Sequence, residues 1–387
     1  MSSVALSLTE PDTTRLLRET VAAVCKPYGH EYFVRQCRER QNPRELWQAL
    51  GEAGLLGVAI PEEHGGGGGG IADLAVVTEE AAASGVPLML LALSPAVCAA
   101  TLVAHGSEEQ KQRWLPGLAS GESVMAFAIT EPDAGSNSHN IATTAVRTDD
   151  GWVLRGQKYY VSHVDNAQAI LVVARVVADD DTAGLSLFVV DVDAPGLTRA
   201  EIEVEMVSPE RQFTLWFDDV RIPADAVVGR PGGGLAVLFT GLNPERIGSA
   251  ALLTGIARYA LGKAARYATQ RQVWGVPIGA HQAVAHPLAR AAVQTELARL
   301  MTAKAAALYD AGLDAAEAAN MAKFAASEAA SAALDAAIQT HGGNGMATEY
   351  GLATLLALVR LFRIAPVSTE MVLNHIARRT LGLPKSY

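Results

Sequence analysis

The stretch Phe127-Ala128-Ile129-Thr130-Glu131-Pro132-Asp133-Ala134-Gly135-Ser136-Asn137 lies close to the point where the hydrophobic pattern of the chain changes. Before it, over residues 15–119, apolar residues recur at helical spacing, as in Leu46, Trp47 and Leu50. Breaks fall at Pro43, at Pro61 and at a run of glycines over residues 65–70. We therefore predict a helical first third, and a different kind of structure from the quoted stretch onward.

After this stretch, short runs rich in β-branched and aromatic residues replace the helical period. They are residues 152–154, 170–173, 187–190, 202–206 and 213–217. From Pro231 onward the chain is rich in Ala and Leu with helical periodicity, broken near residues 275–277, 312 and 342–343. The pattern predicts an α+β multidomain protein with an N-terminal helical domain (1–120), a central β-barrel or β-sandwich domain (121–230) and a C-terminal four-helix bundle (231–387).

The composition excludes several classes of protein. The 387 residues include 31 Lys and Arg against 41 Asp and Glu, a net charge of -10, so no basic face is expected that could bind nucleic acid. Half of the residues are hydrophobic and 19% are charged, which is typical of a chain that folds nearly throughout. Cys25, Cys37 and Cys98 are odd in number and form no CxxC pair, which favours neither a disulfide framework nor a metal site. A reducing cytoplasm is the predicted compartment.

In the first third, residues 1–19 do not fit the pattern of a secretory signal, and residues 81–107 do not fit that of a membrane span. The first nineteen residues lack a basic region followed by a long apolar run, so no secretory signal is predicted. Residues 81–107 contain no Asp, Glu, Lys or Arg, but they include Gly85, Pro87 and Pro95. We expect buried helices that break at the prolines, not a membrane span.

The two glycine clusters are predicted to be flexible loops. Residues 65–70 lack the Lys-Ser/Thr that follows a phosphate-binding loop, and residues 232–234 do not sit in a strand-to-helix dinucleotide fingerprint. The chain also has no G-x-S-x-G or H-E-x-x-H sequence, so the commonest hydrolase signatures are missing.

Four segments together resemble the acyl-CoA dehydrogenase family of FAD flavoproteins, and the likeness covers nearly the whole chain. The first is the quoted stretch. The resemblance implies that Phe127, Ile129 and Thr130 line the flavin, and that Ser136 contacts the cofactor and the thioester or pantetheine part of the substrate. An electron-accepting ring needs hydrogen-bond donors near its N5, O4 and N1 edge. A turn at Pro132 with no cofactor role is the competing interpretation of this stretch alone.

The second segment, Gly156-Gln157-Lys158-Tyr159-Tyr160-Val161-Ser162-His163, resembles the family's strand that packs on the flavin. The resemblance assigns the aromatic contact to Tyr160 and the hydroxyl contact to Ser162, where the family usually has Trp and Thr. The competing interpretation of Tyr160 is an aromatic of the sheet core.

The third and fourth segments are residues 266–278 with Gln282, and residues 339–345. By resemblance, Arg271 pairs with the FAD pyrophosphate of a neighbouring subunit, while Trp274 and Gln282 contact its adenine half. A guanidinium suits a pyrophosphate because its planar fork binds two oxygens. Gln339, Gly342 and Gly343 would let the dinucleotide approach bare backbone. Because these segments serve a partner's flavin in the family, the resemblance implies a homotetramer or homodimer.

The chain departs from the family at the usual catalytic base. Many members use a Glu in a Tyr-Glu-Gly-Thr stretch, and here Pro366 stands at that position with Ser368 at the Thr. Proline also lacks the backbone N–H that serves the family as one of two oxyanion donors. Ser368 and Glu370 are kept as cofactor contacts, Glu370 being a second, weaker candidate for the base.

A branch of the family that includes isovaleryl-CoA dehydrogenase-like members carries its base in a Glu-Arg pair on an earlier helix. Leu242-Asn243-Pro244-Glu245-Arg246-Ile247 supplies such a pair. We expect Pro244 near the first turn of the long helix, with Glu245 at the positive end of the helix dipole. Glu245 is the predicted base, Arg246 is predicted to orient it or to meet the substrate carbonyl, and Asn243 is a predicted substrate contact. A surface charge at a helix start is the alternative.

The resemblance therefore implies an FAD-dependent α,β-dehydrogenation of an acyl-CoA thioester in fatty acid metabolism, with electron-transferring flavoprotein as the acceptor. Two alternatives remain open. One is an oxidase or dehydrogenase of a thioester bound to an acyl carrier protein in secondary metabolism. The other is a catalytically silent homologue that binds FAD or acyl-CoA.

Overall fold

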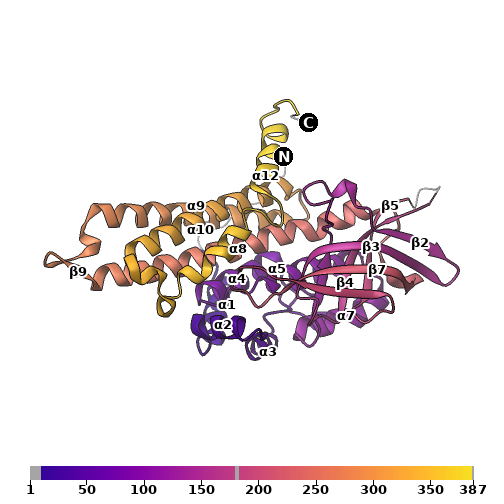
Figure 1. Cartoon of the computed structure of the whole chain (residues 1–387), viewed down its shortest axis with the longest axis horizontal. Helices are drawn as coiled ribbons and strands as arrows, with labels where there is room; N and C mark the ends of the chain where they lie inside the picture. The colour runs from indigo at the N-terminus through magenta and orange to yellow at the C-terminus, as the bar shows by residue number, and fades with distance from the viewer. Residues whose placement is uncertain (1–9, 179–182, 386–387) are drawn as a thin grey trace.

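The structure is a computed structural model that describes residues 10–178 and 183–385, so residues 1–9 of the segment in which no secretory signal is predicted lie outside it. Figure 1 shows helices from both ends of the sequence beside a central sheet. The N-terminal helices are α1 (Asp12–Cys25), α2 (Gly29–Arg38), α3 (Arg44–Glu52), α4 (Ile71–Ala83), α5 (Leu90–Leu93), α6 (Ala100–His105) and α7 (Glu108–Ser120). The helical first third is thus confirmed, and α3 begins directly after Pro43.

The uncharged stretch over residues 81–107 is mostly buried, and its helical path breaks once before α6 ends at His105. The break lies between α4 and α5, at Gly85 and Pro87. The predicted break at Pro95 is wrong, because the helix continues there as a π-helical turn, Ser94–Ala99. A wider turn accommodates a proline that cannot donate to the helix ladder. No helix of residues 10–178 and 183–385 is long and apolar enough to cross a membrane.

The glycine run over residues 65–70 is an ordered loop whose N–H groups are used internally. Those of Gly67, Gly68 and Gly69 donate to the carbonyls of Gly57, Ile60 and Val58. A Cβ on Gly66 would come within 2.0 Å of the Ile60 carbonyl oxygen. The loop therefore has no row of free donors for a phosphate, and its glycines permit close backbone packing. The prediction that it is flexible is not supported by this bonding.

The central sheet is mixed and has eight strands within the described residues. They are β1 (Met125–Ala128), β2 (Thr144–Thr148), β3 (Gly151–Ser162), β4 (Ala169–Val176), β5 (Gly184–Asp191), β6 (Leu197–Ile202), β7 (Gln212–Pro223) and β8 (Val227–Val228). The order is β6-β7-β3-β2-β4-β5-β8, with β1 pairing parallel to β4. Alternate residues of β3, β4, β5 and β7 meet in one core around Trp152 and Phe188, so the sheet curves around that core.

The strand expected over residues 202–206 ends at its first residue. β6 pairs antiparallel with β7 from Leu197, opposite Phe217, to Ile202, opposite Gln212. Because β7 begins at Gln212, residues 203–206 have no partner strand, and their alternation of Glu with apolar residues does not produce a ladder.

The C-terminal part is built on three long helices, α8 (Gly234–Gln270), α9 (Gln282–Asp310) and α10 (Ala316–His341), followed by α11 (Leu356–Leu361) and α12 (Thr369–Arg379). A short hairpin of β9 (Gln272–Val273) and β10 (Val276–Pro277) joins α8 to α9. Small alanine side chains dominate the shared core, which also takes in α4. Such residues let helices approach closely.

The position expected for Pro244 is wrong. α8 begins at Gly234, so Pro244 lies inside the helix and Glu245 is not at its positive end. Proline cannot donate to the carbonyl four residues back, which is that of Thr240. The hydroxyl of Tyr309 on α9 donates to this carbonyl at 2.9 Å instead, so the interior proline leaves no unpaired acceptor.

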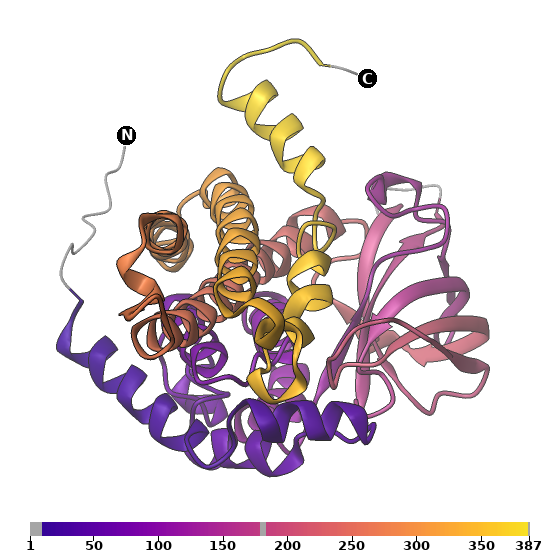
Figure 2. The same cartoon turned by 60° about the vertical axis from the view of Figure 1, so that its left-hand side comes forward.

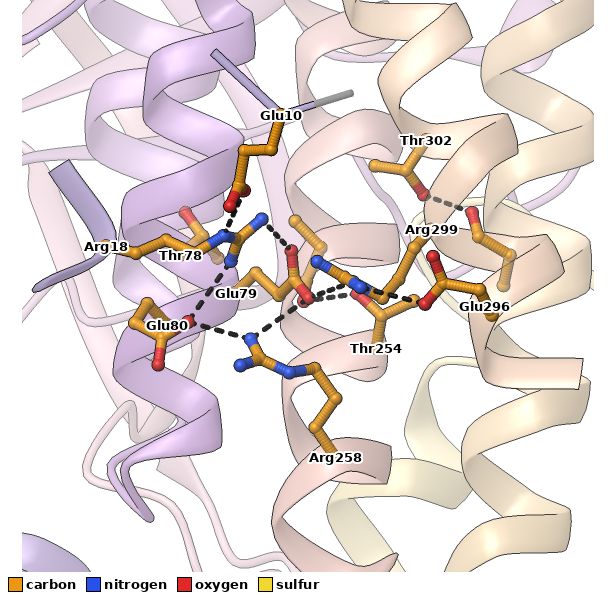
Figure 3. Close-up of polar contacts among 12 residues, drawn as sticks. Glu10, Arg18, Thr78, Glu79, Glu80, Thr254, Arg258, Glu296, Arg299 and Thr302 are labelled. Carbon is orange, nitrogen blue, oxygen red and sulfur yellow. Dashed lines mark hydrogen bonds and ion pairs between the residues drawn. The ribbon is translucent and has the colours of Figure 1, made fainter. Parts of the chain in front are cut away.

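An ion-pair network fastens the N-terminal helices to this bundle (Figure 3). Glu79 of α4 is buried, and its carboxylate accepts from Arg18 of α1 at 3.0 Å and from Arg258 of α8 at 3.1 Å. Arg299 of α9 binds the same carboxylate. One acidic side chain therefore connects four helices from both ends of the chain.

Candidate active site

Glu245 lies in the interior, where α8 packs against the π-helical turn Ser94–Ala99. Only 8% of its surface is exposed, and its carboxyl accepts no hydrogen bond from any residue in the described part of the chain. Burial raises the pKa of this carboxyl to about 7, while the charge of Arg246 acts weakly in the opposite direction. The predicted dipole effect plays no part, because the residue is not at a helix end. A carboxyl with a pKa near neutrality suits a general base.

The π-helical turn beside Glu245 is also tied to the sheet. The Ser94 hydroxyl accepts from the backbone N–H of Met125 at 3.2 Å, and the Cys98 thiol contacts the carbonyls of Met125 and Ala126 at 3.6 Å. The charge of Glu245 adds to burial in raising the pKa of Cys98. Since β1 runs directly into the stretch quoted above, Glu245 and that stretch belong to one connected part of the fold.

Two cationic side chains, Arg246 and Lys323, lie close enough together for the charge of Arg246 to act on the pKa of Lys323. Arg246 donates to Asn243 Oδ1 at 3.1 Å, and burial lowers the pKa of its guanidinium. Its Nε atom is buried and has no hydrogen-bond partner among the described residues. The three predicted residues of this helix segment, Asn243, Glu245 and Arg246, are therefore together.

The second cation, Lys323 on α10, was missed by sequence reasoning. It is fully buried and its ammonium donates to the carbonyl of Val367, directly after Pro366. Burial, with a further contribution from Arg246, lowers its pKa to about 8. A signal was present, because Lys323 interrupts the apolar face formed by Ala319, Ala322, Ala326 and Ala330.

The stretch after β1 lies against the middle of β3. The carbonyl of Thr130 accepts from the N–H of Tyr159 at 2.8 Å. Tyr160 has φ +55° and is 52% exposed, so it is not the core aromatic of the competing interpretation. Ser162 follows on the same strand and donates to Gln212 Oε1 at 3.0 Å. Thr130, Tyr160 and Ser162 are thus close in the fold.

The remaining residues of this group differ in accessibility. Phe127 packs its side chain into the core between sheet and helices, so only its backbone is available to a ligand. Ile129 is half-buried and Ser136 is exposed on the following loop. Ser368 accepts from the N–H of Met371 and so caps α12, and Glu370 is exposed in the first turn of that helix.

A second group lies at the other end of the bundle. Arg271 and Trp274 are exposed on the hairpin, which projects at the left of Figure 1, and Gln282 begins α9. Trp274 is 88% exposed. Gln339 and the open backbone of Gly342 and Gly343 end α10 beside them, with nothing within 4 Å of where a Cβ would stand on either glycine. At about 1.5 Å per residue, the helix between Glu245 and Arg271 spans roughly 39 Å. The second group therefore lies far along α8 from Glu245.

Family models match three successive parts of the chain. They are the N-terminal domain of acyl-CoA dehydrogenase over residues 11–122, its middle domain over 126–220 and its C-terminal domain over 232–381. The chain belongs to the acyl-CoA dehydrogenase family. The three-domain fold expected from the resemblance, with a β domain between two helical ones, is confirmed.

Individual relatives agree with this membership. Acyl-CoA dehydrogenase FadE12 of Mycobacterium tuberculosis is 53% identical over 386 residues, which cover 98% of this chain and 99% of that protein. The solved glutaryl-coenzyme A dehydrogenase in complex with glutaryl-CoA superposes with a TM-score of 0.92 at 31% identity, covering 98% of both chains. PigA, solved with FAD and proline, has a TM-score of 0.92 at 27% identity over 98% of this chain and all of PigA.

Within the described residues, no group of three or more His, Cys, Asp or Glu side chains could hold a metal ion. The free cysteines Cys25 and Cys98 are buried, and burial raises the pKa of both thiols, so neither is an activated nucleophile.

Proposed function

We propose that the chain is an FAD-dependent acyl-CoA dehydrogenase in which Glu245 removes the α-proton of the thioester. The observation that carries this proposal is the buried Glu245 carboxyl with its pKa raised to about 7. Among the described residues it is one of the few buried acids, and it lies where α8 packs against the π-helical turn Ser94–Ala99. The family membership supplies the reaction class.

The proposed chemistry assigns the proton to this chain. Near pH 7 about half of the Glu245 carboxyls are ionised and can accept the α-proton at a carboxylate oxygen. FAD, when bound, supplies the acceptor for the β-hydride. Burial keeps water away from the carboxylate, and the absence of a protein hydrogen bond leaves its oxygens free for the substrate.

We propose that Arg246 and Asn243 contact the carbonyl group of the thioester. Pro366 offers no N–H to the developing oxyanion, and the buried, unpaired Nε of Arg246 is a donor on the same helix as the base. Lys323 holds the carbonyl of Val367 and so fixes the backbone after Pro366.

The FAD contacts fit the residues present, provided that two subunits share them. Thr130, Tyr160, Ser162, Ser136 and the backbone at Phe127 and Ile129 would face the flavin end of one chain, with Ser368 and Glu370 as further contacts. The exposed Arg271, Trp274 and Gln282, with the open backbone at Gly342 and Gly343, would serve the dinucleotide of a partner. The length of α8 between the proposed base Glu245 and Arg271 supports this arrangement.

A second copy of the chain also fits two apolar surfaces. Val293, Leu297 and Leu300 are exposed along one face of α9. α12 stands away from the bundle in Figure 2 and exposes Leu373, with Leu381 following it. Exposed apolar faces of this kind mark protein interfaces, so we assign them to a homotetramer or homodimer.

Two alternatives keep a specific basis. A thioester bound to an acyl carrier protein is a second candidate substrate, and the likeness to PigA, which was solved with FAD and proline, supports a ligand other than an acyl-CoA. Pro366 in place of the usual base supports a silent FAD- or acyl-CoA-binding homologue. Electron-transferring flavoprotein is the proposed electron acceptor. We also propose that the domains span residues 1–120, 121–230 and 231–387.

Anaerobic titration tests the proposal. The purified holoenzyme is mixed with short, branched, medium and long acyl-CoA esters, and with the same acyl groups on a carrier protein, while the flavin absorbance is followed. Bleaching by one CoA class supports the proposal and names the substrate. Bleaching only by carrier-bound thioesters supports the first alternative, and a yellow protein that none of them bleaches supports the silent homologue.

A further inference from the structure

A fully buried ion pair lies directly beneath the proposed flavin-facing residues. Lys158 of β3 has no exposed surface and Glu131 is only 6% exposed. The Lys158 ammonium donates to Glu131 Oε1 at 2.8 Å and to the carbonyl of Ile129 at 2.9 Å. Neither residue has a role in the chemistry described above.

The pair joins three separate segments of backbone. The Glu131 carboxylate also accepts from the N–H of Ala142 at 2.7 Å and from that of Thr143 at 3.0 Å. It therefore links the stretch after β1, the approach to β2, and β3. All four polar bonds of the pair end on these segments, and three of them involve backbone atoms.

The backbone between the pair and the flavin-facing side chains is strained. β3 leaves its regular register with β7 between Lys158 and Val161, and Tyr160 within this irregularity has φ +55°. A bulky residue rarely adopts this conformation, which persists only where the surroundings enforce it. Lys158 anchors one side of the irregularity, and the bond from Tyr159 N–H to the Thr130 carbonyl links its middle to the stretch after β1.

Net stability does not explain such a pair. Two charges that leave water lose free energy of hydration, and their mutual attraction offsets this loss only when the geometry is good. A protein with a well-packed apolar pair of similar size in their place is often as stable. What the pair provides, and an apolar pair would not, is directed bonds that set the backbone at residues 129–131 relative to β3.

We propose that Glu131 and Lys158 are positioning residues for the flavin, which fix Thr130 and Tyr160 in the geometry that binds its ring. This inference rests on the proposed function, since FAD is the ligand concerned. Neither side chain touches the ligand, because both are buried behind the segments that they hold.

The experiment compares FAD binding with folding in the full-length protein. FAD is removed from wild type and from Lys158→Met and Glu131→Gln variants, and FAD is titrated back at a temperature at which circular dichroism shows each apoprotein folded. We expect the Kd for FAD to rise at least tenfold in both variants, with a changed visible circular dichroism spectrum of any bound flavin. The double variant should bind FAD no more weakly than the single variant with the higher Kd, because the two side chains act as a unit.

Two further variants keep the test decisive. Arg155→Met removes an ion pair with Asp219 on the exposed side of the same strand and should leave the Kd unchanged. Glu131→Asp keeps the negative charge but shortens its reach, so it should fold and still weaken FAD binding if the more drastic variants do not fold. Wild-type affinity and spectrum in folded variants, with only a lower melting temperature, would overturn the positioning role. Failure of the wild type itself to bind FAD would instead refute the proposed function.

Discussion

The pKa of Glu245 predicts a pH dependence that can be worked out in advance. A base must be ionised to act, and burial raises the pKa of the free carboxyl to about 7. The rate of flavin reduction at low substrate concentration, which reports the free holoenzyme, should therefore increase tenfold per pH unit below this pKa and level off above it. Relative to the plateau, we expect roughly a tenfold loss at pH 6 and about a hundredfold loss at pH 5.

The same shift predicts an opposite trend in stability. The folded-state pKa of about 7 lies above the ordinary value of 4.5, so the folded protein holds the proton more tightly. This contribution is fully present below pH 4.5 and disappears as the pH rises through 7. Integrated over the shift it amounts to roughly 3 kcal/mol. The free energy of unfolding of the wild type minus that of Glu245→Gln should fall by about this amount across the range, because the other titrating groups are common to both proteins.

Stopped-flow measurement of anaerobic flavin reduction between pH 5 and 9 checks the kinetic part. Glu108→Gln, at an exposed position of α7, is the matched control and should reproduce the wild-type profile. A flat profile, or an inflection near pH 7 in the residual reaction of Glu245→Gln, would refute the reasoning, because another group would then be titrating.

Three further predictions concern cofactor and stability. Arg271→Ala should lower the flavin-to-protein ratio after gel filtration, and an unchanged ratio would contradict the pyrophosphate role. Glu79→Gln should lower the free energy of unfolding in urea by about 3 kcal/mol, because Arg18, Arg258 and Arg299 share its carboxylate. The control Glu296→Gln, at an exposed partner of Arg299, should lower it by less than about 1 kcal/mol. Equal losses would show that the buried position of Glu79 is not special. Asp310→Asn should cost about 1 kcal/mol, since its carboxylate accepts the N–H groups of Ile71 and Ala72 at the start of α4, and a neutral result would remove that capping role.

The order of helical and β segments could be predicted from the sequence because its signals are local. Apolar spacing and the glycines and prolines between runs mark most elements, including the ends of α8, α9 and α10. Pro244 misled the prediction because proline favours the first turn of a helix, whereas here Tyr309 from another helix compensates for it. The strand expected over residues 202–206 failed because a strand needs a partner, which a local pattern does not reveal.

The site shows the same division. Glu245 and Arg246 could be found by resemblance, but the expected position of Glu245 at the positive end of a helix was wrong, and its pKa is raised by burial inside the fold. Lys323, and the pairing of Glu131 with Lys158, depend on contacts between residues 27 to 44 positions apart along the chain. Such contacts exist only in the folded structure.

The most direct test of the central claim is the rate of flavin reduction in Glu245→Gln with the acyl-CoA that bleaches the wild type. The variant keeps the size of the side chain and should keep FAD, so the predicted result is a yellow protein that reduces its flavin more than about a hundredfold more slowly. A variant that bleaches at the wild-type rate would contradict the assignment of Glu245 as the base.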